Sequence, residues 1–402
     1  MNLSYKLPTT RLHLPSARAD GGQASYKLKI GIVCYPSIGG SGIVATNLGV
    51  ELAKLGHQIH FISYESPFLL EKRKNIHFHK VNINKYDLFK YPDYTLPLAV
   101  AIEAVQKKYK LDIVHVHYAV PHATAALLAR RIMRTNNVPM PKIVTTLHGT
   151  DITLLARDKN LFEVIKYSIE RSHGVTAVSE SLKADTLKII KPQRPIEVIY
   201  NFYSPAAITK SRHLIRKGLE IKDSDFLAIH LSNLRPVKRI PDLLKIVSLI
   251  PDSKFKLLIL SGGDFTSFKP LVKKLGIANK IILKQSIKDI GNYINAADIG
   301  IYTSAEESFG MGILETLAYG KAVLATKAGG VPEVVNDGID GILARVGDVK
   351  GFAKNLKMLM NNRRLLEQMG KAAKKSACEK FCSKKIVPQY VEYYKTILSE
   401  KK

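Results

Sequence analysis

Residues 28–42 read LKIGIVCYPSIGGSG, and this segment indicates the fold class of the protein. Leu28–Tyr35 is almost continuously apolar, as in a strand that is buried on both faces of a parallel sheet. Gly39 and Gly40 follow, and Gly42–Leu55 then carries apolar residues at helical spacing. A strand, a glycine turn and an amphipathic helix in this order predict the first unit of an α/β domain.

The same alternation of β-rich and helical segments continues along the chain in two series. The first series of predicted strands is Leu28–Tyr35, His57–Tyr64, Asp112–Tyr118, Lys142–His148, Gly174–Ser179 and Ile196–Phe202. The second is Phe226–Ser232, Lys256–Ser261, Lys280–Lys284, Ile299–Ser304, Ala322–Thr326 and Gly341–Ala344. Two series of this kind predict two doubly wound, Rossmann-like α/β domains whose loops face each other across a central cleft.

The expected organisation has five parts. They are a disordered leader (1–27), an N-terminal domain (28–203), a polar linker (204–225), a C-terminal domain (226–384) and a final helix (385–402) that packs back toward the N-terminal domain. For the leader, a dispensable extension and a processed targeting peptide both stay open, although it lacks the apolar run of a secretory signal.

Composition narrows the class of protein. The 402 residues include 61 Lys+Arg against 34 Asp+Glu, a net charge of +27, and only 3 Cys. No apolar run approaches the roughly 18 residues of a spanning helix, and three cysteines do not make a disulfide framework, so we expect a reducing, cytoplasmic location. The charge permits nucleic acid, an anionic membrane or phosphorylated small molecules as partners. Residues 351–402 contribute 13 Lys/Arg against 4 Glu.

Two segments have the chemistry of an anion site. The glycines before Ser41 stand where backbone N–H groups and a helix N-terminus can approach a phosphate or carboxylate, although a plain tight turn explains them equally well. The Gly-x-Gly-x-x-Gly fingerprint is absent in that register. Arg235 and Lys238 flank a proline turn after the first strand of the second series, so both can reach one diphosphate. A solvated basic turn is the alternative.

Carboxylates and one imidazole complete the candidate set. Glu307 and Glu315 have seven residues between them, one after a strand and one in the following helix. Glu315 stands where it can accept hydrogen bonds from a ribose diol, and Glu307 where it can face a sugar ring. His148 ends a strand and can bond a sugar hydroxyl, although such a histidine is more often structural.

Three signals for metal binding are discounted. His115 and His117 share one strand face without a completing ligand, and Asp223-Ser224-Asp225 precedes a strand and is read as a turn. Cys378 and Cys382 lack the two further ligands that zinc needs.

The order of these motifs resembles the family-4 retaining glycosyltransferases with the B-type two-domain fold, over about residues 28–400. Five segments narrow the resemblance. They are KIGIVCYPS (29–37), HFIS (60–63), FKYPDY (89–94), HYAVPH (117–122) and TTLHGTDIT (145–153). The resemblance implies UDP-N-acetylglucosamine (UDP-GlcNAc) as donor and L-malate as acceptor, with retention of configuration, as in the first step of bacillithiol synthesis. The N-terminal domain would bind the acceptor and the C-terminal domain the nucleotide sugar.

The resemblance also assigns roles to residues. Catalytic roles fall to Arg235, Lys238, Glu307 and His148. Donor binding falls to Gly39, Gly40, Arg235, Lys238, Glu307, Phe309, Gly310 and Glu315. Acceptor binding falls to Ser41, Tyr94, Thr150 and Lys166. No metal or other cofactor is expected, since the leaving phosphate can accept the proton of the attacking hydroxyl.

Two departures from the family weaken the assignment of the uracil contacts. Where relatives commonly have a Gly-Asp-Gly-Pro-like turn, this chain has Ser261-Gly262-Gly263-Asp264-Phe265, and Lys284-Gln285-Ser286-Ile287 lacks the usual glycine.

Other classes stay open. A glycolipid glycosyltransferase of the same fold would use the basic surface and the apolar residues within 66–100 on an anionic membrane. A nucleic-acid-binding protein rests on charge alone, and no recognition motif supports it. A homodimer and a weak membrane association are also left open.

Overall fold

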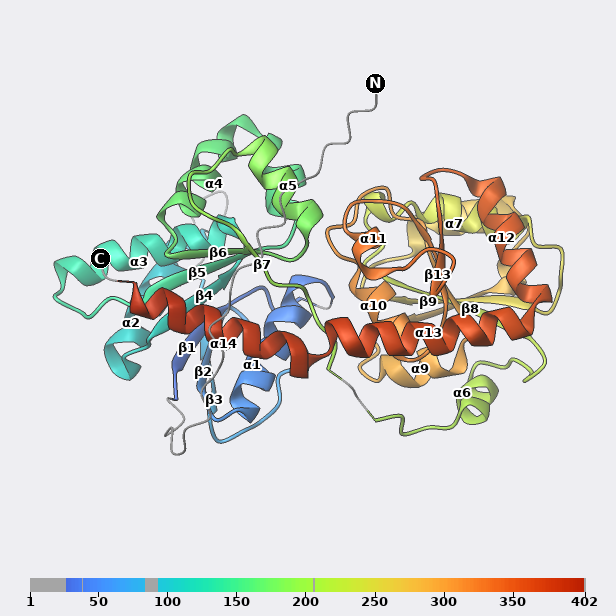
Figure 1. Ribbon diagram of the computed structural model, residues 1–402, viewed down its shortest axis with the longest axis horizontal. Helices are drawn as coiled ribbons and strands as arrows, with labels where there is room; N and C mark the ends of the chain where they lie inside the picture. The colour runs from blue at the N-terminus through green and yellow to red at the C-terminus, as the bar shows by residue number, and fades with distance from the viewer. Residues whose placement is uncertain (1–26, 38, 84–92, 205–206, 401–402) are drawn as a thin grey trace, which may run out of the picture.

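The protein is described by a computed structural model that covers residues 27–37, 39–83, 93–204 and 207–400. Its two lobes each contain one parallel sheet (Figure 1). Residues 1–26 of the expected leader and the quoted residues Ile38 and Phe89–Pro92 lie outside the described residues.

The first sheet has seven parallel strands in the order β3-β2-β1-β4-β5-β6-β7. These strands are β1 (Lys29–Val33), β2 (Gln58–Ser63), β3 (Ile76–Lys80), β4 (Ile113–His117), β5 (Lys142–Leu147), β6 (Gly174–Ala177) and β7 (Glu197–Val198). The helices between them are α1 (Ser41–Lys54), α2 (Thr95–Tyr109), α3 (Thr124–Thr135), α4 (Lys159–Arg171) and α5 (Glu180–Ile189), with short helical turns at Ala119–Ala123, Thr150–Leu154 and Leu155–Arg157.

The second sheet repeats this arrangement with six strands in the order β10-β9-β8-β11-β12-β13. They are β8 (Phe226–Ser232), β9 (Phe255–Ser261), β10 (Ile281–Gln285), β11 (Ile299–Tyr302), β12 (Val323–Thr326) and β13 (Gly341–Ala344). The associated helices are α7 (Ile240–Ser248), α8 (Lys269–Lys274), α9 (Ile290–Ala296), α10 (Met311–Ala318), α11 (Val331–Val334) and α12 (Val349–Asn361), with short turns at Pro236–Lys238, Thr266–Phe268 and Ala278–Lys280. Both orders reverse direction beside the first strand, which is the doubly wound pattern that the sequence predicts.

One strand was not predicted. β3 lies at the edge of the first sheet, and its residues are half-buried or exposed. Its alternating Ile76, His77, Phe78 and His79 lack the continuous apolar run by which the central strands were recognised.

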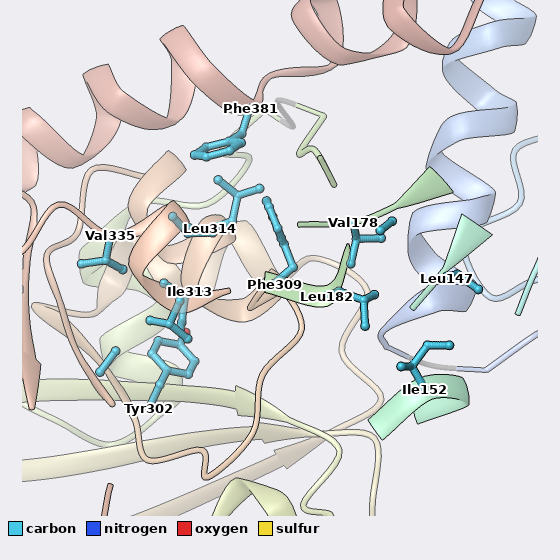
Figure 2. Close-up of a cluster of buried hydrophobic side chains, with 14 of the residues drawn as sticks. Leu147, Ile152, Val178, Leu182, Tyr302, Phe309, Ile313, Leu314, Val335 and Phe381 are labelled. Atoms are coloured by element: carbon cyan, nitrogen blue, oxygen red, sulfur yellow. The ribbon is translucent and has the colours of Figure 1, made fainter. Parts of the chain in front are cut away.

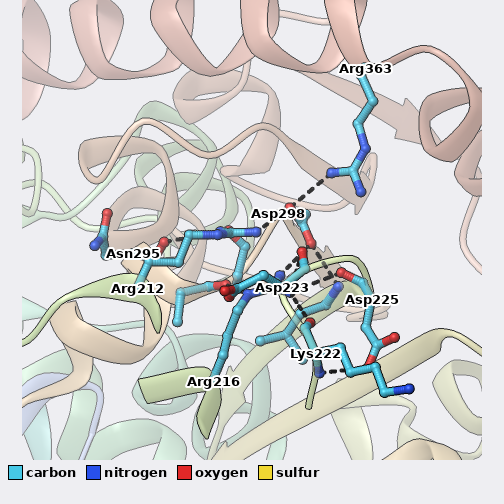
Figure 3. Close-up of polar contacts among 11 residues, drawn as sticks. Arg212, Arg216, Lys222, Asp223, Asp225, Asn295, Asp298 and Arg363 are labelled. Carbon is cyan, nitrogen blue, oxygen red and sulfur yellow. Dashed lines mark hydrogen bonds and ion pairs between the residues drawn. The ribbon is translucent and has the colours of Figure 1, made fainter. Parts of the chain in front are cut away.

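The predicted linker is not simply a connector, because it contains helix α6 (Arg212–Gly218). Figure 3 shows two arginines of this segment directed at Asp298, the residue immediately before β11. Arg216, whose side chain is fully buried, bonds Asp298 at 2.8 Å, and Arg212 bonds it at 2.7 Å. Arg363 contacts the same carboxylate at 3.0 Å. A buried guanidinium requires such partners, so most of this segment is anchored to the second lobe.

The C-terminal helices connect the two lobes. α13 (Arg363–Phe381) packs on α10, whereas α14 (Ser383–Ser399) contacts α1 and β5 of the first lobe (Figure 1). Tyr390 and Tyr394 of α14 are buried in one apolar cluster with Ile30 and Ile32 of β1.

A second apolar cluster spans both lobes. Figure 2 shows Val178 and Leu182 from the first lobe near Phe309 and Leu314 from the second, and Phe381 closes the cluster. This shared core fixes how the carboxyl ends of the two sheets face each other.

Candidate active site

The carboxyl ends of both sheets border one cleft of about 950 Å³. Open parallel sheets place ligand sites at this end of their strands. Eleven of the thirteen predicted site residues line it. They are Gly39, Gly40, Ser41, His148, Thr150, Arg235, Lys238, Glu307, Phe309, Gly310 and Glu315.

The glycine turn begins the wall that the first lobe contributes. Gly39 and Gly40 adopt φ angles of 99° and 57°, a left-handed region that side chains with a Cβ adopt at a cost. The turn allows α1 to begin at Ser41, with the N-terminus of the helix at the cleft. Amide groups at a helix N-terminus favour an anion, so the geometry suits a phosphate or a carboxylate.

Asp151 fixes the conformation of the loop after β5. Its carboxylate accepts backbone N–H groups from Ala119 at 3.3 Å, His148 at 3.2 Å and Gly149 at 2.9 Å. Burial raises the pKa of Asp151 to about 6, and these three hydrogen bonds oppose the rise. The carboxylate thus sets the course of the loop that presents His148 and Thr150 to the cleft.

His148 is held in place by a second imidazole. Its Nε2 lies 2.8 Å from Nδ1 of His117 on β4. Burial lowers the pKa of His148 to about 3, so the ring is neutral at physiological pH. A neutral imidazole at this position can hydrogen-bond an oxygen of a substrate but cannot supply a positive charge.

Tyr118 is a cleft residue that the sequence analysis missed. It follows β4 with a φ of 93°, an uncommon conformation for an aromatic residue. Burial raises the pKa of its phenol, and hydrogen-bonding side chains of Ser41 and Thr150 oppose the rise. The sequence signal that could have identified Tyr118 was an aromatic hydroxyl at the carboxyl end of a predicted parallel strand.

The second lobe contributes a charged wall. Lys238 Nζ and Glu307 Oε2 lie 2.5 Å apart, and both side chains are only 16% exposed. Ser304 Oγ donates to the same carboxylate oxygen at 3.3 Å. Arg235 reaches across the cleft, where its Nη1 donates to Thr150 Oγ1 at 3.2 Å. The two predicted cations therefore lie on one face of the cleft, and one of them already contacts the opposite wall.

Helix α10 completes this wall. Gly310 precedes the helix with a φ of 99°, and Glu315 lies on the helix at the cleft lining. Burial raises the pKa of Glu315 to about 7. Phe309 also borders the cleft, but its ring packs against Tyr200 and Phe381 at centroid distances of 6.0 and 5.5 Å. Donor contacts of these three residues stay predictions.

Two predicted acceptor residues do not line the cleft. Tyr94 precedes α2, and its ring packs edge-on against Tyr64 and His122 at centroid distances of 5.4 and 6.0 Å. Lys166 lies on α4, away from the lining, whereas Arg157 does line it. Their roles toward an acceptor stay predictions that the geometry does not favour.

The loops expected near the uracil also border the cleft. Gly262, Ser286 and Ile287 belong to the lining. Gln285 Nε2 donates to the carbonyl of Gly263 at 2.9 Å, which ties the two unusual turns together. Lys288 lies 5.3 Å from the centre of the Phe68 ring, a contact between the lobes.

Several other groups have structural partners. His115 bonds Tyr394 Oη and Thr146 Oγ1, each at 2.7 Å, and Asp225 accepts the backbone N–H of Lys222. Within the described residues no group of three or more His, Cys, Asp or Glu side chains is arranged to hold a metal ion. The structure likewise contains no helix, over the ranges it describes, with the length and apolar character needed to traverse a bilayer.

Glu333 lies on α11 and does not line the cleft, whereas Gly329 in the loop before this helix does. The carboxylate of Glu333 instead accepts the backbone N–H groups of Glu180 and Ser181 at 2.8 and 2.9 Å. A residue of the second lobe therefore caps helix α5 of the first, and this contact helps to hold the two lobes together.

Comparison with known proteins agrees with this geometry. The Glycosyltransferase Family 4 model matches residues 38–206, and the Glycosyl transferases group 1 model matches residues 211–376. The chain therefore belongs to the family-4 glycosyltransferases with the B-type fold. It is 41% identical, over 94% of its length and 99% of the relative's, to the N-acetyl-alpha-D-glucosaminyl L-malate synthase of Bacillus anthracis. An uncharacterized glycosyltransferase of Methanocaldococcus jannaschii is 26% identical over 88% of this chain and 94% of its own.

Solved structures share the fold. Sucrose-phosphate synthase from Thermosynechococcus elongatus superposes with a TM-score of 0.79 at 18% identity, over 93% of this chain and all of its own. Anabaena HepE in complex with UDP-glucose gives 0.76 at 19% identity, over 92% of this chain and all of its own. At these identities the likeness speaks for the two-domain architecture alone.

Proposed function

We propose that this protein transfers N-acetylglucosamine from UDP-GlcNAc to the hydroxyl group of L-malate, with retention of the anomeric configuration, as the first step of bacillithiol synthesis. The observation that carries the proposal is the 41% identity, over nearly the whole of both chains, to a synthase whose name states that product. The cleft supports it, because the cations Arg235 and Lys238 on one wall face the neutral hydrogen-bonding groups at the strand ends of the other.

The donor fits the charged wall. Arg235 offers a planar fork of N–H donors and Lys238 a compact charge, and together they can hold the diphosphate. Glu307 accepts one N–H of Lys238, which orients the ammonium group while its other N–H bonds point elsewhere. Glu315 would accept the ribose hydroxyls.

The reaction needs no protein base. The malate hydroxyl oxygen attacks the anomeric carbon on the face from which the diphosphate departs, the carbon–oxygen bond to the phosphate breaks, and the hydroxyl proton passes to the leaving phosphate oxygen. The protein stabilises the negative charge that develops on the diphosphate, which positioned Arg235, Lys238 and backbone amides can do. We therefore propose a metal-independent reaction.

Mass spectrometry after incubation with UDP-GlcNAc and L-malate tests the proposal, with and without EDTA. We expect the malyl N-acetylglucosaminide in both samples. Product that appears only without EDTA would refute metal independence. No malyl product, together with transfer to an extracted lipid, would refute the choice of acceptor.

A glycolipid glycosyltransferase is the second candidate, favoured by apolar side chains exposed on the first lobe. Leu96 and Val100 on α2 are 59% and 58% exposed, and Leu154 at the cleft is 62% exposed. Flotation with vesicles that contain anionic lipid separates the candidates, because the malate enzyme does not need to bind them for turnover.

A further inference from the structure

His117 lies directly behind His148, on the side away from the cleft. His117 ends β4 and is completely buried, whereas His148 borders the cleft. The Nδ1 of His117 is 2.8 Å from the Nε2 of His148, so one of these nitrogens donates a proton to the other. Which one donates determines where His148 carries its own N–H.

Both rings are neutral, because burial lowers the pKa of each well below 6.5. A neutral imidazole has one N–H and one bare nitrogen. If His148 donated from Nε2, the N–H of His117 would have to be on its Nε2. That atom is buried and has no hydrogen-bond partner among the described residues. Buried N–H groups without an acceptor are rare and cost a lost hydrogen bond, so this arrangement is disfavoured.

A neighbouring histidine shows that the opposite arrangement is tolerated here. His122 Nδ1 lies 2.5 Å from the backbone oxygen of His117, and a carbonyl oxygen only accepts. The N–H of His122 is therefore on Nδ1, and its Nε2 is bare. That Nε2 is also buried without a partner among the described residues. One ring beside His117 thus already has the protonated Nδ1 and bare Nε2 that we infer for His117.

The ring of His117 is also fixed in orientation. It stacks on His115, with ring centroids 4.5 Å apart. His115 is in turn bonded at both nitrogens, to Tyr394 of α14 and to Thr146 of β5. The orientation of the His117 ring is therefore set by a packed group that extends from the cleft to the last helix.

We propose that His117 donates its Nδ1–H to Nε2 of His148 and thereby holds His148 as the tautomer protonated on Nδ1. His148 then offers the cleft an N–H donor, which suits an oxygen of the donor sugar or its phosphate. His117 is a positioning residue in this scheme, since it acts through His148. The catalytic consequence rests on the proposed function, whereas the tautomer does not.

The tautomer can be measured without substrate. In protein labelled with ¹⁵N-histidine, the ring signals of His148 are assigned by their loss in His148→Gln. We expect a pyrrole-type shift for Nδ1 and a pyridine-type shift for Nε2. Protonation on Nε2, or on both nitrogens, would overturn the proposal, and neither result depends on which acceptor the enzyme uses.

Two variants of equal size test the consequence. His117→Asn keeps an N–H donor near the position of Nδ1, whereas His117→Asp replaces it with an acceptor. We expect kcat within about threefold of wild type for Asn and at least about tenfold lower for Asp, since one hydrogen bond of about 1.4 kcal/mol corresponds to tenfold. In the Asp variant the His148 shifts should change to a protonated Nε2.

Thermal melts establish that each variant folds. If the His117→Asp variant does not fold, the His117→Leu variant is used in its place. In the His117→Leu variant we expect the ¹⁵N signals of His148 to show a mixture of tautomers. Equal kcat values for Asn and Asp, or unchanged His148 shifts in the Asp or Leu variant, would contradict the role of His117.

Discussion

The two walls of the cleft are built on the same strand order but differ in chemistry. The second lobe presents charge: Arg235, Lys238, Glu307 and Glu315. At its strand ends the first lobe presents neutral hydrogen-bonding groups: Ser41, Tyr118, His148 and Thr150, with the amides at the start of α1. The charged residues that it adds to the lining, which are Lys54, Glu71, Arg157 and Asp185, do not directly follow a strand. The same strand order thus supports two kinds of site. The residues at the strand ends differ between the lobes, whereas the arrangement of the strands does not.

This contrast indicates that the two walls have different roles in catalysis. Charge that develops on a leaving diphosphate needs cations already in position, whereas a hydroxyl acceptor needs orientation. Substitutions on the two walls should therefore differ in size and in the kinetic parameter they change.

The largest expected effect is on the charged wall. Lys238→Ala should lower kcat by about 10²-fold or more, because a positioned donor to the developing charge is lost. Steady-state kinetics with UDP-GlcNAc measure it, and Lys245→Ala, an exposed lysine on the neighbouring α7, is the control. If the Lys238 variant has a kcat close to that of the wild type, the charged wall does not have the catalytic role that distinguishes it from the other wall.

The next effect concerns the point where the walls touch. Gly149 has a φ of +110°, and a Cβ there would lie 1.6 Å from Ser308 Oγ. Gly149→Ala should therefore oppose closure and lower kcat/KM by about tenfold, equivalent to 1.4 kcal/mol. The double variant with Ser308→Gly removes the clash but keeps the backbone strain, so we expect partial recovery. No recovery at all would mean that strain alone is responsible.

A smaller effect should appear in the pH dependence of stability. The pKa of Glu315 is raised to about 7 from 4.5, so the folded state binds its proton more tightly than the unfolded state does. Stability is then lost as pH rises between these values. Glu315 is only partly buried, so solvent screens much of this penalty, and Glu315→Gln should stabilise the protein by about 1 kcal/mol at pH 8 and change it little near pH 4.5. Urea unfolding at both pH values measures this, and equal differences at the two would contradict it.

The smallest effect is expected on the neutral wall. Thr150→Val removes the hydroxyl that accepts from Arg235 and should raise KM for malate by about threefold with kcat little changed, as for one exposed hydrogen bond. Thr150→Ser keeps the hydroxyl and serves as the matched control. A fall in kcat as large as that of Lys238→Ala would show that the two walls do not divide the work as we infer.

The fold could be predicted from the sequence because buried parallel strands are continuous apolar runs. Eleven predicted site residues line the cleft because they follow such strands or lie at the start of the next helix. Contacts between elements that are far apart in the sequence were not predicted. Glu333 caps α5 across the lobe boundary, and Arg216 of the expected linker is buried against Asp298. Local patterns record which face of an element is apolar, not which distant element covers it.

The position of α14 also has a consequence for how the protein is made. Tyr390, Tyr394 and Ile397 complete the core around β1, although more than 300 residues separate the two segments in the chain. During synthesis the other elements of the first lobe are translated before the second lobe, yet the helix that covers this core is translated after it. Domains usually fold as units in the order of translation. Here the first lobe completes its core only after the second lobe has been translated, so until then a nascent chain exposes the apolar surface that α14 will cover.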